Sequence, residues 1–148
     1  MVDTNRLLDK NVIIRFCNRL LSSKMIDIYA LGSNESLAAR FSYRLQSLGI
    51  MCSLHNSHNP LYIQYNQNQS KRVSLIIVSH HANDTIINIA KSLKEKNIYT
   101  LALCPKSEKE LMFLVHECLH FSVMHHEDYE NICTCFAIEY VLDVICSI

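Results

Sequence analysis

Two short polar segments of the chain carry the residues whose types and spacing suit ligand binding. Each segment follows an apolar run and precedes a segment of helical periodicity. The candidate ligand-binding residues are Gly32, Ser33 and Asn34 after the run 25–31, and Ser79, His81, Asn83, Asp84 and Thr85 after the run 73–78. Backbone N–H groups and the positive end of the dipole at a helix N-terminus bind anions, and nearby hydroxyl groups complete such sites. The pattern predicts a phosphate ligand, with the alternative that Ser, Asn and Asp serve only as N-caps.

The elements that must position these residues alternate between strand and helix. Short apolar runs predict strands at 25–31, 50–54, 73–78, 98–103 and 118–123. Apolar residues at helical spacing predict helices at 4–22, 34–48, 86–96, 108–114 and 127–148, with a weaker helical segment between 60 and 69. Nearly continuous apolar strands linked by helices are typical of a parallel sheet that is buried on both faces. The sequence therefore predicts an α/β fold, a three-layer α/β/α sandwich with a five-stranded parallel sheet.

The predicted sheet also indicates where a ligand binds. In open parallel sheets, ligands lie beyond the carboxyl ends of the strands, at the point where the direction of winding reverses. We expect that point to fall between the first and third strands, so the two polar segments should lie side by side.

Length, charge and cysteine content limit the class of protein. We expect the 148 residues to form a single domain, with helix 4–22 leading into an α/β core at 25–148. Lys plus Arg and Asp plus Glu both number 14, so no net positive charge attracts nucleic acid. Seven cysteines scattered through apolar segments are typical of reduced thiols and predict a cytoplasmic protein. No apolar run approaches the roughly 18 residues of a membrane span, so we expect no membrane partner.

Other groups of reactive residues favour structural roles. His116 and His120 have metal-ligand spacing for a helix, but we expect His120 in the last strand. Cys133 and Cys135 fit the apolar pattern of the last helix, which indicates core residues. The chain has no phosphate-binding or dinucleotide-binding fingerprint. We therefore expect no metal and no cofactor.

Two motifs resemble those of the sugar isomerase (SIS) domain. The segment Ile28-Tyr29-Ala30-Leu31-Gly32-Ser33-Asn34 is similar to the first motif, an apolar strand ending in G-x-G-S-S. The segment from Leu75 to Thr85 is similar to the second, a strand followed by S-x-S-G-x-T. The similarity extends to 91–103 and to the last helix, with Asp143 near its end, and so covers nearly the whole chain. It implies a flavodoxin-like SIS fold that binds a phosphosugar.

The motifs of this chain depart from the family pattern at the phosphate site. The resemblance places phosphate-binding hydroxyl groups at positions 34, 79, 81 and 84, of which this chain keeps only Ser79. Alanine replaces glycine at positions 30 and 82. A carboxylate at position 84 repels a phosphate 4 Å away by about 1 kcal/mol in water and about 4 kcal/mol at an effective dielectric constant near 20. We therefore hypothesise a partly degenerate site in which Thr85 faces the ligand, Asp84 caps its helix and a protonated His81 supplies positive charge.

The resemblance is strongest to the effector-binding half of RpiR-type transcriptional regulators. It implies a phosphosugar sensor without catalytic residues, which forms a homodimer or tetramer through its first and last helices. Such a protein contacts DNA only through a helix-turn-helix domain, and we expect none in this chain. One alternative is a sugar-phosphate isomerase, for which His55, His58, Glu127 and Glu139 are candidate general bases. The other is a structural dimerisation module that binds no ligand.

Overall fold

The computed structural model describes residues 10–66, 71–79 and 81–121, and its centre is a sheet of five parallel strands. The strands are β1 (Met25–Ala30), β2 (Met51–His55), β3 (Arg72–Ile77), β4 (Tyr99–Pro105) and β5 (Glu117–Phe121). Their order across the sheet is β2-β1-β3-β4-β5. This is the flavodoxin-like order, in which the winding reverses between β1 and β3. The predicted parallel sheet and the position of its reversal are confirmed.

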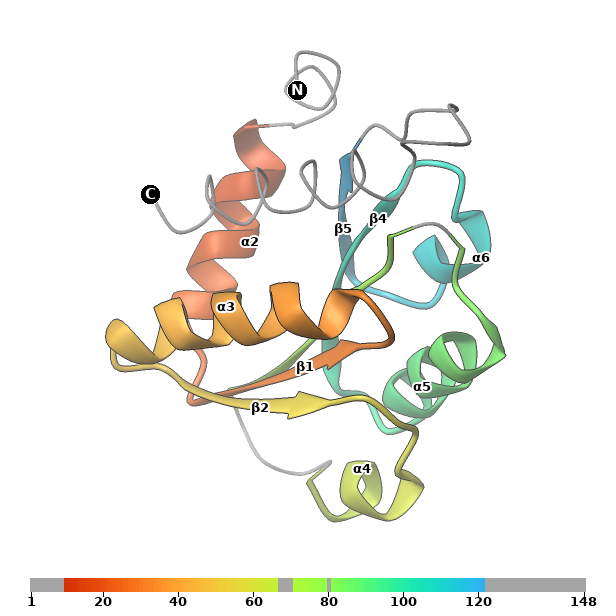
Figure 1. Ribbon diagram of the computed structural model, residues 1–148, viewed down its shortest axis with the longest axis horizontal. Coiled ribbons are helices and arrows are strands. Elements are labelled where there is room, and N and C mark those ends of the chain that lie inside the picture. The colour runs from red at the N-terminus through yellow and green to blue at the C-terminus, as the bar shows by residue number, and fades with distance from the viewer. Residues whose placement is uncertain (1–9, 67–70, 80, 122–148) are drawn as a thin grey trace.

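Helices cover both faces of the sheet and make the predicted three layers (Figure 1). One face packs against α2 (Lys10–Ser22) and α3 (Asn34–Ser47). The other face packs against α4 (Pro60–Asn66), α5 (Asp84–Glu95) and α6 (Lys109–Met112). Among the described residues, no helix is long and apolar enough to cross a membrane.

Strand β1 shows why its sequence forms a buried central strand. Ile26 and Ile28 are fully buried on the face covered by α2 and α3. Asp27 and Tyr29 alternate with them and are buried on the opposite face, as expected because successive side chains of a strand point to opposite sides. One strand therefore contributes to both hydrophobic cores, and its only charged residue has to be neutralised inside the protein.

Where the described ends of the elements differ from the predicted ends, they differ by one or two residues. Strand β4 continues to Pro105, because its pairing with β5 extends to Pro105 opposite Phe121. The short helix at 108–114 is confined to Lys109–Met112. Helix α3 ends at Ser47, and the chain then turns through Gly49, whose φ of +84° is a left-handed conformation that glycine adopts freely. Residues 4–9 and 67–69 of two predicted helices, and the whole predicted helix at 127–148, lie outside the described residues.

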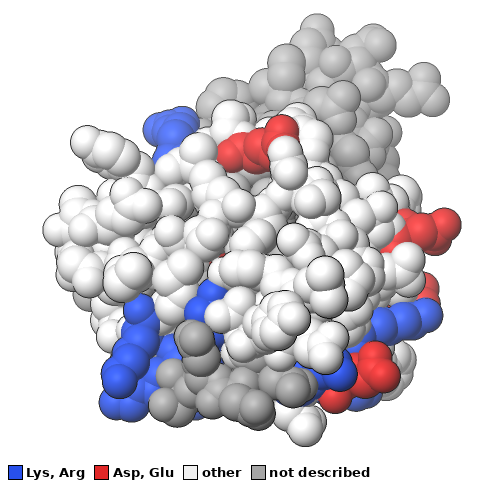
Figure 2. Space-filling model, turned by 90° about the horizontal axis from the view of Figure 1, so that it is seen from below, with Lys and Arg blue, Asp and Glu red and all other residues white. Residues whose placement is uncertain are grey.

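Charges are unevenly placed on the face that Figure 2 shows. Lys and Arg side chains lie in separate groups, mainly along the lower part of this view, and acidic side chains lie among some of them. Most of this face is uncharged.

Candidate functional site

The reversal between β1 and β3 brings the two polar segments together. The two strands are paired along their length, from Met25 opposite Arg72 to Ala30 opposite Ile77. Beyond these ends, Nδ2 of Asn34 donates a hydrogen bond to Oγ of Ser79 over 3.3 Å. Asn34 is only 6% exposed. The structure therefore joins two predicted site residues that are 45 positions apart in the sequence.

A tight turn places Asn34 at the start of α3. Gly32 has a φ of +62°, and the N–H of Asn34 donates to the carbonyl of Leu31. Ser33 precedes the helix in helical conformation, with φ −63° and ψ −16°, and its side chain makes no capping hydrogen bond. The alternative that the serine and asparagine of the first segment serve as N-caps is wrong at α3. Ser33 lacks the extended backbone typical of a capping residue, and the Asn34 amide donates to Ser79 instead.

The Asn34 amide has an unused hydrogen-bonding atom. Its Oδ1 is buried and has no hydrogen-bond partner among the described residues. Leaving a buried polar atom without a partner typically costs about 1–3 kcal/mol. A side-chain amide can also turn over and exchange its oxygen and nitrogen. Asn34 can thus present either an acceptor or a donor while it keeps a hydrogen bond to the Ser79 hydroxyl.

The second polar segment is fixed by a cap at the start of α5. Asn83 has an extended backbone, and its side-chain Oδ1 accepts a hydrogen bond from the N–H of Ile86 over 2.9 Å. Asp84 follows as the first residue of the helix and is exposed, and Thr85 is half-buried. The hypothesis that Asp84 caps the helix is wrong, because Asn83 is the N-cap residue and Asp84 is the first residue of the helix.

His81 is held by a carboxylate that the sequence analysis did not single out. Its Nδ1 lies 2.9 Å from Oε1 of Glu108, which follows β4. The His81 side chain is 87% exposed, whereas that of Glu108 is 11% exposed. Glu108 therefore offsets the positive charge that a protonated His81 would supply to a phosphate. No local sequence pattern indicates this pair, because only the adjacency of β3 and β4 brings the two loops together.

A cavity of about 240 Å³ lies beside the turn that follows β1, on the side away from Ser79. It is situated between α3 and the carboxyl ends of β1 and β2. Its lining combines apolar side chains with a carboxylate, an imidazole-bearing residue and an amide, namely Ile28, Ala30, Glu35, Ala38, Leu54, His55 and Asn56. The sequence analysis did not predict this cavity, because its walls come from three separate elements.

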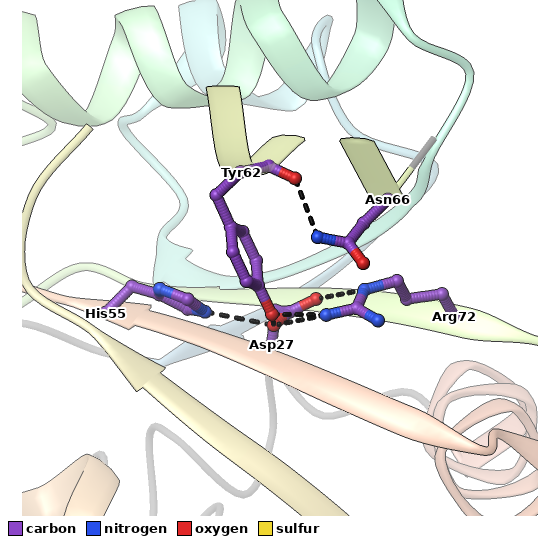
Figure 3. Close-up of polar contacts among 5 residues, drawn as sticks. All are labelled: Asp27, His55, Tyr62, Asn66 and Arg72. Atoms are coloured by element: carbon purple, nitrogen blue, oxygen red, sulfur yellow. Dashed lines mark hydrogen bonds and ion pairs between the residues drawn. The ribbon is translucent and has the colours of Figure 1, made fainter. Parts of the chain in front are cut away.

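A buried charge cluster centred on Asp27 lies between α4 and the sheet (Figure 3). Oδ2 of Asp27 accepts a hydrogen bond from Nε of Arg72 over 2.7 Å. Its Oδ1 accepts from the hydroxyl of Tyr62 over 2.7 Å and lies 2.9 Å from Nε2 of His55. Burial by itself raises the pKa of Asp27, but hydrogen bonds from His55, Arg72 and Tyr62 outweigh it and hold that pKa below its usual value. The cluster thus connects α4 and the end of β2 to β1 and β3.

Two of the four candidate general bases are engaged in structural contacts. Besides its bond to Asp27, the His55 ring stacks on Tyr29 with 4.7 Å between the ring centres. Nε2 of His58 lies 2.8 Å from the hydroxyl oxygen of Ser92. Glu127 and Glu139 lie outside the described residues.

The histidines considered as metal ligands also have other contacts. His120 lies in β5, as predicted, and its Nδ1 is 3.2 Å from the carbonyl oxygen of Cys104. His116 precedes that strand, and its Nδ1 accepts a hydrogen bond from the N–H of Thr100. Within the described ranges, no three His, Cys, Asp or Glu residues are grouped as metal ligands. Cys133 and Cys135 lie outside those ranges.

Comparison with solved structures identifies the class to which this fold belongs. No family model and no curated protein sequence matches the chain. The NanR protein of Vibrio vulnificus complexed with ManNAc-6P is similar over 98% of this chain, with 15% identity and a TM-score of 0.82. The sugar isomerase domain of an RpiR transcription factor from Sphaerobacter thermophilus is similar over 97%, with 13% identity and a TM-score of 0.79. The chain has the fold of an SIS domain, as predicted.

The same fold occurs in proteins of different function. A hypothetical protein of Methanococcus jannaschii, whose structure was taken to indicate a 3-hexulose-6-phosphate isomerase, is similar over 93% of this chain, with 16% identity and a TM-score of 0.73. This chain spans 55% of the NanR chain, 79% of the Sphaerobacter chain and 75% of the Methanococcus chain. SIS domains of regulators and of phosphosugar isomerases are thus both among its structural neighbours.

Proposed function

We propose that the chain is the phosphosugar-binding sensor and dimerisation domain of an RpiR-type transcriptional regulator and has no catalytic activity of its own. The observation that carries this proposal is the hydrogen bond between Asn34 and Ser79, which joins the two loops where the sheet reverses. The NanR neighbour supports the phosphosugar as ligand, because that protein was solved in complex with ManNAc-6P.

The phosphate group of the ligand binds between the two loops in this proposal. The Ser79 hydroxyl donates to it, and the N-terminal N–H groups of α3 and α5 add the favourable field of two helix dipoles. Thr85 contributes a second hydroxyl from the first turn of α5. Asn34 replaces a family hydroxyl with an amide. In its bond to Ser79 the hydroxyl oxygen accepts, so the hydrogen of the Ser79 hydroxyl stays available to the phosphate.

A sensor acts through the different affinities of its ligand for two arrangements of the protein. We place all 148 residues in one domain, a cytoplasmic homodimer or tetramer whose subunits associate through the first helix and the segment 127–148. The ligand favours one arrangement of that assembly, and a DNA-binding domain outside this chain responds to it.

Calorimetric titration tests this proposal with mannose 6-phosphate and with ManNAc-6P. Ser79→Ala removes the hydroxyl and should weaken binding of either ligand by about tenfold, the effect of one hydrogen bond to a charged group. Ser47→Ala is the matched control, because Ser47 lies at the far end of α3 and its hydroxyl bonds only to the carbonyl of Arg44. If neither ligand binds or shifts the melting temperature while the protein is a stable dimer, the chain is a structural module instead.

A sugar-phosphate isomerase is the second candidate function, and one observation favours it. Glu108 orients the exposed imidazole of His81 at the same edge of the sheet as Ser79. A histidine oriented by a carboxylate is a common general base. Turnover of ribulose or hexulose phosphates that disappears in His81→Asn would establish the isomerase and overturn the sensor.

A further inference from the structure

The cavity between α3 and the β1–β2 edge adjoins the first loop on the side away from Ser79. Ala30, at the end of β1, and Glu35, in the first turn of α3, both line it. These two residues flank the turn that carries Gly32 and Asn34. Asn34 itself points toward β3. The turn thus has the proposed phosphate site on one side and the cavity on the other.

The cavity lining combines an apolar floor with a polar rim. Ile28 and Ala38 are 0% and 1% exposed and form the floor, and Leu54 of the edge strand β2 is 46% exposed and forms one wall. Glu35 and Asn56 are exposed and supply a carboxylate and an amide at the rim. The cavity therefore suits a group that carries a methyl, a hydrogen-bond donor and an acceptor together.

The charge on Glu35 determines which end of a phosphosugar enters. No ion pair neutralises Glu35 among the residues that the structure describes. A phosphate in this cavity would face that carboxylate, and the two negative charges repel each other. The neutral end of the ligand therefore lies here, and its phosphate lies toward Ser79.

We propose that the cavity binds the acylamino group of a phosphorylated N-acyl amino sugar. This inference depends on the proposed function, because the phosphate has to lie between the loops. The amide N–H of the acylamino group donates to Glu35, its carbonyl accepts from the Asn56 amide, and its methyl packs on Ile28 and Ala38.

The spacing of the strands is compatible with one ligand that reaches both places. Strand β1 lies between β3 and β2, and neighbouring strands are about 4.8 Å apart. The proposed phosphate site lies at the ends of β1 and β3, and the cavity lies at the ends of β1 and β2. Their centres are therefore separated by about one strand spacing. A hexose ring with a phosphate at one end and an acylamino group at the other is longer than this separation.

Calorimetric titrations of three proteins with two ligands test the inference. The ligands are ManNAc-6P and mannose 6-phosphate, which differ at the acylamino group. Wild-type protein should bind ManNAc-6P roughly tenfold more tightly, since a buried methyl and one net hydrogen bond together contribute about that factor. Ala38→Leu fills the cavity and should abolish this preference, so that the affinities for the two ligands become similar. Ala39→Leu, at the exposed neighbouring position of α3, is the matched control and should keep the preference.

A second variant avoids any effect of the larger side chain on folding. Asn56→Ala removes the exposed amide at the rim and should reduce the preference for ManNAc-6P over mannose 6-phosphate severalfold. Equal affinity of wild-type protein for the two ligands would overturn the inference and leave the proposed function in place. Failure of both ligands to bind would overturn both. A preference for ManNAc-6P that survives in Ala38→Leu and in Asn56→Ala would place the acylamino group elsewhere.

Discussion

The side-chain amide of Asn34 donates a hydrogen bond to the hydroxyl of Ser79 across the two loops where the sheet reverses its winding. In this bond, the oxygen of the one hydroxyl that the second motif keeps from the family pattern accepts, and its hydrogen stays free to donate. The bond also buries Asn34 at the start of α3. In the proposed function, Asn34 and Ser79 lie together beside the phosphate.

Replacing Asn34 by serine should increase the affinity for a hexose 6-phosphate. Asn34→Ser supplies a second hydroxyl beside that of Ser79, so we expect binding about tenfold tighter, the contribution of one hydrogen bond to a charged acceptor. The same change should lower the free energy of unfolding by about 1 kcal/mol, because the bond between the loops is lost. Titration calorimetry and urea denaturation measure the two effects. Weaker phosphate binding in Asn34→Ser would show that the amide itself holds the ligand.

Removing Arg72 should strongly destabilise the fold. Arg72→Met leaves the carboxylate of Asp27 buried without its cationic partner, which typically costs about 3–5 kcal/mol. Asp27→Asn combined with Arg72→Met removes both charges and should be less destabilised than Arg72→Met alone. Urea denaturation of the three variants at pH 7 measures this difference. Losses that simply add would mean that the two side chains act independently.

The Asp27 cluster also predicts how stability changes with pH. Because the pKa of Asp27 is lower in the folded protein than in the unfolded chain, its ionised form stabilises the fold. This contribution is fully present above the unfolded pKa, about 3.9, and is lost as the pH falls through the folded pKa. Wild-type protein should therefore lose stability below about pH 4, and Asp27→Asn should show a smaller loss over the same range. Parallel pH profiles for the two proteins would contradict this role of Asp27.

The N-cap of α5 also leads to a prediction about the stability of the protein. Asn83→Ala removes the hydrogen bond to the N–H of Ile86 and should cost about 1 kcal/mol. Asp84→Ala should cost less, because Asp84 acts only through the helix dipole from the exposed first turn. Thermal unfolding of both variants gives the comparison. A larger loss in Asp84→Ala would assign the cap to Asp84 instead.

Much of the fold could be predicted because its strands are nearly continuous apolar runs. The segments at 25–31 and 73–78 are short apolar runs typical of strands in a sheet that is covered on both faces. The reversal between them then places Asn34 near Ser79. The cluster at Asp27 could not be predicted in this way. It depends on residues from β2, α4 and β3 that meet only in the folded register. The pair of His81 and Glu108 depends in the same way on the adjacency of β3 and β4.

A crystal structure of the protein with bound ManNAc-6P would test the central claim most directly. We predict that a phosphate oxygen lies within hydrogen-bond distance of Oγ of Ser79 and of backbone N–H groups at the start of α5. We also predict that the Ser79 hydroxyl donates to the phosphate while its oxygen still accepts from the Asn34 amide. A phosphate bound elsewhere would contradict this account.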